Sequence, residues 1–288
     1  MSLLLLFWCI TTFILSSQLF KQKENKNPED VDDAPLHYLN DTLTNLVDFK
    51  FGIGRHDRAQ KFIIYDRIFV GQNFLGLSKR FGVSLATQSS YDRLHWITQS
   101  TQSWIGPVSA ALFAYDSEEI DRVFTLLSHL LTCYPRIRDN IAFSLVHPLT
   151  SKRHNTSLHI QTEDSHCSDS RSYLANLNKN EKKKNGGRYN YPQNLMRNVA
   201  RVNCLTSYTM SLDIDIVPSM GLAESLSKFL NRNTCAKCAF VIPTFEVANT
   251  VAFPANKSEL LRLVKQSQAQ PFHKKVFIHN QFATNFSR

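Results

Sequence analysis

Residues Leu212-Asp-Ile-Asp-Ile-Val-Pro-Ser219 place two carboxylates, Asp213 and Asp215, two positions apart. The residues before them, 208–211, alternate between apolar and polar side chains, which is typical of a β-strand. Side chains at positions i and i+2 of a strand point to the same face. Because proline cannot donate to a sheet ladder, the strand is predicted to end at Pro218, with both carboxylates near its carboxyl end. Open α/β sheets bind their ligands at that edge.

Paired carboxylates supply the hard oxygen ligands that Mg²⁺ and Mn²⁺ prefer, and a cation held there would bind a diphosphate. Asp-X-Asp is also the pattern of glycosyltransferases that use nucleotide sugars. Alone it is weak evidence, because Asp-rich strand ends and turns arise by chance. Two like charges on one strand face repel unless a cation lies between them. Removing one carboxylate is therefore expected to leave the metal-free fold as stable as before, or slightly more stable.

Strands and helices are predicted to alternate from about Phe81 onward. The expected strands are 83–87, 108–114, 140–147, the Asp-X-Asp strand and 239–243, and 62–65 with 68–70 is expected to form a short hairpin. The expected helices are 91–100, one capped by Asp116, one opened by Pro192, 221–230, and one capped by Asn256. This spacing predicts an α/β fold with a mixed, mainly parallel sheet and helices on both faces.

The N-terminal residues 1–20 are almost continuously apolar and just long enough to span a bilayer. They are predicted to form a signal-anchor, with a cleaved signal peptide as the alternative. Large residues before Ser16 disfavour cleavage, whereas the lysines that follow the segment oppose the anchor orientation under the positive-inside rule. Residues 21–76 are predicted to be a stem and N-terminal extension, and residues 77–288 the main α/β domain.

Both alternatives place the rest of the chain in the secretory lumen. Four Asn-X-Ser/Thr sequons agree with that location: Asn40, Asn155, Asn256 and Asn285. Of the six cysteines only Cys9 lies in the apolar segment. An odd number follows it, so at least one cysteine is unpaired or pairs between chains. Cys235-Ala-Lys-Cys238 is interpreted as a local disulfide or free thiols, because no second zinc-binding half with suitable spacing is evident.

The formal net charge of the 288 residues is +9. Much of the excess lies in 21–26 and 179–188, and the low apolar content of the second run predicts a solvated surface loop. A nucleic-acid-binding protein would combine such charge with interleaved aromatic residues or a known motif. Neither accompanies the charge, so no nucleic-acid partner is expected.

Six segments, taken in order, resemble glycosyltransferase family 49. They are Val83–Gln88, Trp104–Phe113, Tyr191–Arg201, Asp213–Ser219, Val241–Glu246 and Asn256–Leu260. One such motif would be weak, whereas six in one order are specific, and the resemblance covers about Phe81 to Arg288. It implies a GT-A fold and a single-pass type II Golgi membrane protein whose catalytic domain is lumenal.

The resemblance further implies an inverting, Mn²⁺-dependent hexuronyltransferase. Its donor would be UDP-glucuronic acid and its acceptor a xylose-terminated O-mannosyl glycan of the dystroglycan type. Asp213 and Asp215 would hold the metal, and Arg197 would offer its planar fork to the diphosphate or the uronate. Thr87 is expected near the uridine, and Glu246 is expected to be the general base that inversion requires.

Structural roles stay open for three of these residues. Thr87 can satisfy backbone groups at a strand end, Arg197 can be a surface helix arginine, and Glu246 can form a structural salt bridge. Members of the family continue past the position of Arg288 with a Gly-Phe-Leu-Val-His-like segment whose histidine would complete the metal site. His273 and His279 do not stand in that motif. The chain is therefore expected to be C-terminally incomplete and a poor catalyst, and the alternative function is an inactive lumenal binding protein.

Overall fold

The structure is a computed structural model of the chain. It describes residues 54–149, 167–170, 173–174, 190–233 and 238–275, together with the backbone of 7–10 and 20–21. Most of the expected membrane segment, the lysine-rich run 179–188 and three of the sequons lie outside these residues. In the described part of the chain, no helix is long and apolar enough to cross a membrane.

A seven-stranded mixed sheet forms the centre of the described fold, in the order β2-β8-β5-β6-β7-β4-β3. Its central strands run parallel: β8 (Tyr208–Ser211), β5 (Val83–Ser90), β6 (Val108–Phe113) and β7 (Ile141–Pro148). The edges are antiparallel, with β4 (Phe62–Val70) and β3 (Arg55–His56) on one side and β2 (Phe20–Lys21) on the other. The predicted mixed, mainly parallel α/β sheet is therefore confirmed.

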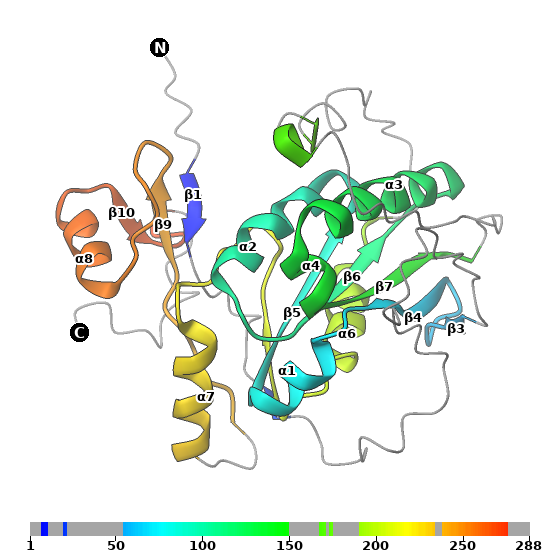
Figure 1. Cartoon of the computed structure of the whole chain (residues 1–288), viewed down its shortest axis with the longest axis horizontal. Helices are drawn as coiled ribbons and strands as arrows, with labels where there is room; N and C mark the ends of the chain where they lie inside the picture. The colour runs from blue at the N-terminus through cyan, green and yellow to red at the C-terminus, as the bar shows by residue number, and fades with distance from the viewer. Residues whose placement is uncertain are drawn as a thin grey trace.

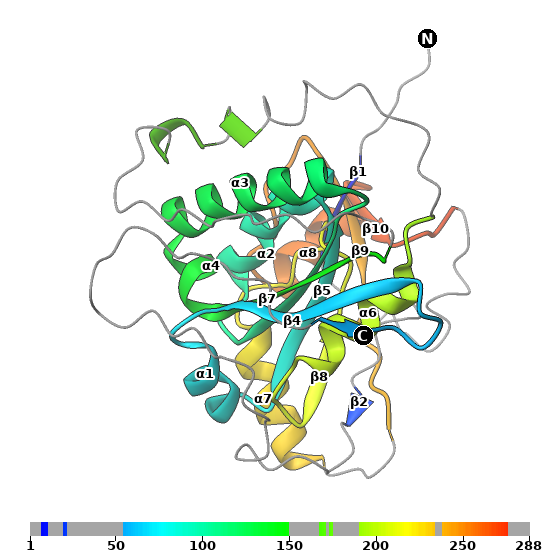
Figure 2. The ribbon, with the colours of Figure 1, turned by 90° about the vertical axis from the view of Figure 1, so that its right-hand side faces the viewer.

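Helices cover both faces of this sheet. The larger core packs under α2 (Ile97–Ser103), α3 (Ser117–Cys133), α4 (Pro135–Asn140) and α7 (Leu222–Arg232). The smaller core lies under α6 (Gln193–Val202), where Met196 and Val199 pack against Ala86 of β5 and Phe113 of β6. Figure 2 shows the sheet from its β4 edge, with α3 and α4 on one side and α6 on the other. A short helix, α1 (Phe74–Arg80), follows β4.

A second sheet has three strands in the described residues, β1 (Phe7–Ile10), β9 (Phe245–Ala248) and β10 (Ala269–Pro271), with both neighbours of β9 antiparallel to it. Helix α8 (Lys257–Lys265) covers it through Leu263, which packs against Val247. Figure 1 shows this sheet and α8 at the left, on the side of α2 and α7 that lies away from β4.

Both predicted side-chain caps are present. Asp116 Oδ1 accepts from the Glu119 N–H at 2.9 Å at the start of α3. Asn256 Oδ1 accepts from the Glu259 N–H, also at 2.9 Å, at the start of α8. A cap of this kind satisfies a helix N–H that would otherwise lack a partner. The amide oxygen of Asn256 is thus already engaged, which makes this sequon a poor site for a glycan.

The predicted hairpin at 62–65 and 68–70 is wrong. Both segments belong to the single strand β4, whose pairing with β7 shifts between Tyr65 and Phe69. Inside this bulge Arg67 has a φ of 50° and its N–H donates to Ser144 Oγ at 3.0 Å. From Tyr65 to Phe69 the strand β4 advances four residues while β7 advances two, and this irregularity interrupts the regular strand pattern, which is why the sequence resembles two strands. Since β4 pairs with β7, the folded sheet begins within residues 21–76.

The predicted strand at 239–243 is also wrong, because the backbone enters a ladder only at Phe245. Burial alternates along this segment without strand pairing: Phe240 and Ile242 pack on the main core, whereas Val241 is exposed. The ring of Phe240 lies 5.0 Å from that of Phe229 and 6.3 Å from that of Tyr208. The segment is therefore a packed connection from α7 to the small sheet.

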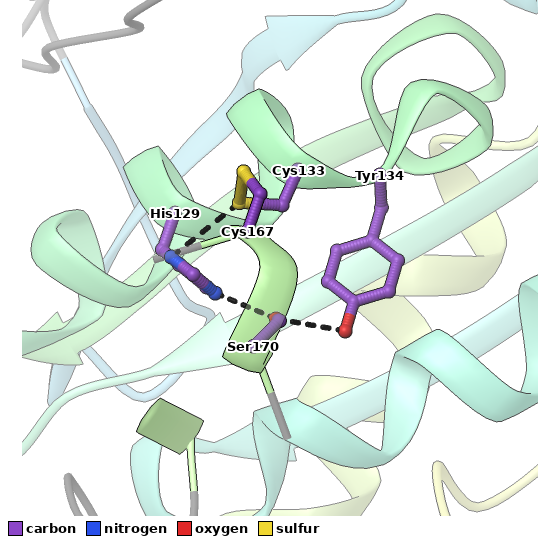
Figure 3. Close-up of a disulfide and its surroundings, with 5 residues drawn as sticks. All are labelled: His129, Cys133, Tyr134, Cys167 and Ser170. Atoms are coloured by element: carbon purple, nitrogen blue, oxygen red, sulfur yellow. Dashed lines mark hydrogen bonds between the residues drawn. A yellow bond between two sulfur atoms is a disulfide. The ribbon is translucent and has the colours of Figure 1, made fainter. Parts of the chain in front are cut away.

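A disulfide fixes the segment 167–170 on α3. Cys133, the last residue of α3, is bonded to Cys167, with their Cα atoms 5.2 Å apart. Beside it, His129 Nε2 lies 2.7 Å from Ser170 Oγ, and the Tyr134 hydroxyl lies 2.9 Å from the same oxygen (Figure 3). These buried polar groups satisfy one another, as burial requires.

The remaining described cysteines differ in state. Cys238 is disulfide-bonded, with a partner whose side chain lies outside the described residues. Cys204 is a buried thiol outside any disulfide whose Sγ donates to the Ala200 carbonyl at 3.4 Å, and burial raises its pKa to about 12. The predicted cysteine outside the intrachain disulfides is therefore confirmed within the described part of the chain, and its environment makes it unreactive at neutral pH.

We expect the Cys133–Cys167 bond to contribute substantially to stability. It closes a loop with a sequence separation of 34. For such a loop the chain-entropy relation gives about 4 kcal/mol. The paired substitution Cys133→Ala and Cys167→Ala should lower the free energy of unfolding in urea by up to that amount. Reducing the wild-type protein should cost at least as much, because the bond of Cys238 also breaks. An unchanged urea midpoint would contradict this expectation.

Candidate functional site

The Asp-X-Asp stretch leaves the sheet earlier than predicted. Strand β8 ends at Ser211, and Asp213 and Asp215 lie in the turn that follows. The turn is closed by the Ile216 N–H, which donates to the Asp213 carbonyl at 3.0 Å. Pro218 therefore does not end the strand, because the backbone has already turned away from the ladder.

Burial still alternates through this turn. Leu212, Ile214 and Ile216 are each at most 4 % exposed, whereas both aspartates are half-buried. Backbone bonds hold the turn at the end of β5, since the Leu212 N–H donates to the Ala86 carbonyl at 2.9 Å. The apolar side chains point into the core, and both carboxylates remain partly open to solvent. That the two carboxylates share one side stays a prediction, and a turn, not a strand, carries them.

Asp213 is held by side chains from two other elements. Arg197 on α6 donates through Nη2 to both carboxylate oxygens, at 2.9 and 3.2 Å. Gln88 near the end of β5 donates through Nε2 to Oδ1 at 3.1 Å. The Arg197 and Asp213 side chains are only 22 % and 24 % exposed, so water screens this ion pair weakly.

Gln88 is itself bonded to Tyr191, whose hydroxyl donates to Gln88 Oε1. Gln88 is 7 % exposed, and the Tyr191 ring meets Phe113 edge to face with 5.5 Å between centroids. Burial, followed by the charge of Asp213, raises the pKa of Tyr191 well above its ordinary value. The phenol therefore keeps its proton at physiological pH and remains a hydrogen-bond donor.

Asp215 has a more open environment. Its carboxylate pairs with Arg93, which lies in the short 3-10 helix η1 (Tyr91–Trp96) after β5. The side chains are 53 % and 36 % exposed, so this pair is well screened by solvent. Each carboxylate of the Asp-X-Asp stretch thus faces one guanidinium, and the two pairs differ in how freely they can rearrange.

Thr87 is not brought to this cluster. Neighbouring residues of a strand point to opposite faces. Leu85 belongs to the larger core and Ala86 to the smaller one, so Thr87 points to the face opposite Gln88. The Thr87 side chain is 3 % exposed and its Oγ1 has no hydrogen-bond partner in the structure. Its contact with a uridine stays a prediction, and one that requires the covering side chains to move.

Glu246 lies on β9 of the small sheet, where both carboxylate oxygens are engaged. Oε2 accepts from Gln270 Nε2 at 2.8 Å, and Oε1 accepts from the His273 N–H at 3.0 Å. These contacts stabilise β9 against the β10 segment. His273 therefore lies beside Glu246. The assignment of Glu246 as general base stays a prediction.

The donor set suits a divalent cation that a second molecule helps to hold. Asp213 and Asp215 offer hard oxygen ligands in the turn after β8. Among the residues that the structure describes, no group of three His, Cys, Asp or Glu side chains could enclose a metal. An all-protein cage is thus not formed by these residues. A cation shared between the two carboxylates and the oxygens of a diphosphate is compatible with them.

Three residues of the cluster were not predicted as site residues from the sequence: Gln88, Arg93 and Tyr191. Gln88 and Tyr191 lie inside segments that resemble the family, and this position was the feature of the sequence that could have identified them as site residues. Arg93 lies outside them. Their contacts span 125, 122 and 103 residues of sequence, so only the folded chain brings them to the carboxylates.

Residues 82–288 match a family described as "Glycosyl-transferase for dystroglycan". The chain is 32% identical over 215 residues to beta-1,4-glucuronyltransferase 1 of Bos taurus, which covers 72% of this chain and 50% of that relative. It is 27% identical over 284 residues to the beta-1,4-glucuronyltransferase 1 of Danio rerio, which covers 94% of this chain and 63% of that relative. It is 26% identical over 223 residues to the xylosyl- and glucuronyltransferase LARGE2s of Gallus gallus, which covers 76% of this chain and 25% of that relative. The chain spans about half the length of the glucuronyltransferases that it matches.

Because each carboxylate forms an ion pair, replacing either aspartate by asparagine should destabilise the metal-free protein. The sequence alone predicted equal or higher stability. Asp213→Asn leaves the shielded Arg197 without a charged partner and should lower the free energy of unfolding by about 1–2 kcal/mol. Asp215→Asn breaks only an exposed pair and should cost less than about 1 kcal/mol, with a smaller effect at high salt. Urea unfolding of the metal-free proteins measures both. Stabilisation by either variant would mean that repulsion between the carboxylates dominates after all.

Proposed function

The chain belongs to the family of glycosyltransferases for dystroglycan, and on this premise we propose that it transfers a sugar from a nucleotide-sugar donor to a glycan acceptor. The observation that carries the proposal is the pair Asp213 and Asp215 at the carboxyl edge of parallel strands, each faced by an arginine. Carboxylates bind a cation, and guanidiniums bind phosphate oxygens in a planar fork. Such a mixture of charges at this edge of a sheet suits a metal-bound diphosphate.

The donor proposed is UDP-glucuronic acid, and the acceptor a xylose-terminated O-mannosyl glycan of the dystroglycan type. The names of the relatives support this choice, because they are described as glucuronyltransferases and as xylosyl- and glucuronyltransferases. The family description names dystroglycan. Two arginines beside the carboxylates agree with a donor that carries a diphosphate and a uronate.

Mn²⁺ is the proposed cofactor, held by Asp213 and Asp215 together with the diphosphate. When bound, a divalent cation neutralises the negative charge that builds on the leaving UDP. The chain's own contribution is positioning. Arg197 and Gln88 fix the Asp213 carboxylate, and Arg93 is exposed enough to turn from Asp215 toward a phosphate or uronate oxygen. The Asp213 carboxylate is thus positioned before the donor binds, which is the condition for efficient electrostatic stabilisation.

Inversion at the anomeric carbon needs a base that takes the proton of the attacking acceptor hydroxyl. Glu246 is proposed for this role from its place in the family motif. Its carboxylate accepts two hydrogen bonds within the small sheet, so at least one of them would have to exchange for the acceptor hydroxyl.

We expect Mn²⁺-dependent binding of UDP, and at most slow transfer of glucuronic acid to a xyloside. Asp213→Asn and Asp215→Asn should each abolish the Mn²⁺-dependent rise in melting temperature that UDP produces, because each removes a charged ligand of the cation. EDTA should have the same effect on the wild-type protein. UDP stabilisation that survives in both variants would make the carboxylate pair structural.

The same assay separates the enzyme from the inactive binding protein. Transfer with bound Mn²⁺ and UDP supports the enzyme, whereas UDP binding without transfer supports the binding protein. Glu246→Gln tests the base, since it should remove transfer while leaving UDP binding intact. Loss of stability with normal turnover per folded molecule would assign Glu246 to the β9–β10 contact alone.

We further propose that the protein works in the lumen of the Golgi, as a membrane-anchored glycoprotein. The Cys133–Cys167 bond and the bonded state of Cys238 support an oxidising compartment. The apolar residues 1–20 and the sequons support entry into the secretory pathway.

Digestion with an N-glycosidase should therefore increase the gel mobility of protein expressed in animal cells. Asn256 should not carry a glycan, because its side chain caps α8. Ser258→Ala removes that sequon but keeps the cap, so it should leave the shift unchanged. Cytosolic protein with no shift would contradict the lumenal location, and a smaller shift in Ser258→Ala would show that Asn256 carries a glycan.

A further inference from the structure

We propose that Tyr191 and Gln88 are positioning residues of the donor site: the Tyr191 hydroxyl orients the Gln88 amide, and that amide holds the Asp213 carboxylate in place for the metal and diphosphate. This inference rests on the proposed function, since it gives both residues a role in the same site. Neither side chain is expected to touch the reacting atoms. Both would act through Asp213.

The chemistry of a primary amide explains why Tyr191 matters. Gln88 has one end that accepts hydrogen bonds and one that donates them. The Tyr191 hydroxyl donates to Oε1, which leaves Nε2 directed at Asp213 at 3.1 Å. A flipped amide would place Oε1 against the carboxylate, and two acceptors would then face each other. The Asp213 carboxylate can only accept, so it favours Nε2, and the Tyr191 hydroxyl reinforces that orientation by donating its proton to Oε1.

Rigid surroundings hold both partners. Gln88 lies on β5, where it is paired with Ala111 of β6 two residues past the last pair with β8, and it is almost fully buried. The Tyr191 ring lies edge to face against Phe113, which is completely buried. Tyr191 stands two residues before α6, the helix that carries Arg197. Asp213 is therefore held from β5 through Gln88 and from α6 through Arg197.

The two carboxylates of the turn are consequently unequal. Asp213 receives donors from two buried or half-buried side chains, whereas the Asp215 pair with Arg93 is exposed. We assign Asp213 as the fixed ligand and Asp215 as the one that adjusts. Burying an amide and a phenol costs desolvation unless their bonds are complete, and here the bonds end at the carboxylate that faces the site. Outer partners of metal ligands typically change metal affinity by about 10- to 100-fold.

Tyr191→Phe tests the proposal, because it keeps the ring against Phe113 and removes only the hydroxyl. Affinity for UDP in the presence of Mn²⁺, measured by calorimetry, should fall by about tenfold or more. The melting temperature of the metal-free protein should change little. Tyr115→Phe is the matched control: Tyr115 also meets Phe113 edge to face, at 4.7 Å, and it should keep wild-type affinity.

Gln88→Met shows whether the two residues act in series. It removes the amide at similar volume and should weaken binding at least as much as Tyr191→Phe. The double variant should bind no more weakly than Gln88→Met alone, because Tyr191 acts only through the amide. Additive losses would overturn the proposal, since they would mean that Tyr191 contacts the ligand or the fold independently.

A readout without ligand separates this inference from the proposed function. In the wild-type protein the Gln88 side-chain amide protons, identified by their absence in Gln88→Met, should exchange slowly in NMR spectra. Tyr191→Phe should speed their exchange and Tyr115→Phe should not. If the wild-type protein fails to bind UDP with Mn²⁺, the proposed function fails and this measurement decides whether Tyr191 orients Gln88. If the wild-type protein binds UDP and Tyr191→Phe binds equally well, only the positioning role fails.

Discussion

The hydrogen-bonded ion pair between Arg197 and Asp213 is the contact on which the site depends. It joins helix α6 to the turn after β8, and it lies where water screens it poorly, with about a quarter of each side chain exposed. The sheet brings the partners together because β8 and β5 run parallel and end at the same edge. Helix α6 packs on the same face through Met196 and Val199. Apolar packing thus sets the distance at which the charged groups meet.

Charges of opposite sign surround the two aspartates of the turn. Each carboxylate has a guanidinium beside it, so their mutual repulsion is offset within the chain. The pairs are not equivalent, since one is shielded and supported by a buried amide while the other is open to solvent. A cation and a diphosphate bring the same two kinds of charge to the site. The arginines can therefore exchange carboxylate oxygens for phosphate oxygens with little change in total charge.

Much of the fold follows from the spacing of apolar residues and from the capping residues that start helices. The apolar runs at β5, β6 and β7 predict strands buried on both faces, and the caps at Asp116 and Asn256 predict the starts of α3 and α8. Prediction fails where local pattern and tertiary contact disagree. The bulge in β4 imitates a hairpin, and the apolar residues before β9 pack as a connection because the aromatic ring of Phe240 finds partners in the core.

The sequence by itself determined the candidate residues for the proposed chemistry, namely the Asp213 and Asp215 pair and Arg197 one helix earlier, and the ordered motifs that indicate the family. Residue type and spacing are sufficient to identify such candidates, because the chemistry of a side chain limits which ligands it can bind. Only the tertiary structure decided that Gln88, Tyr191 and Arg93 join the carboxylates, that Thr87 points to the opposite face, and that Glu246 is bonded within the small sheet. These contacts connect residues that are far apart in the chain. Sheet pairing and helix packing, which no local pattern specifies, bring them together.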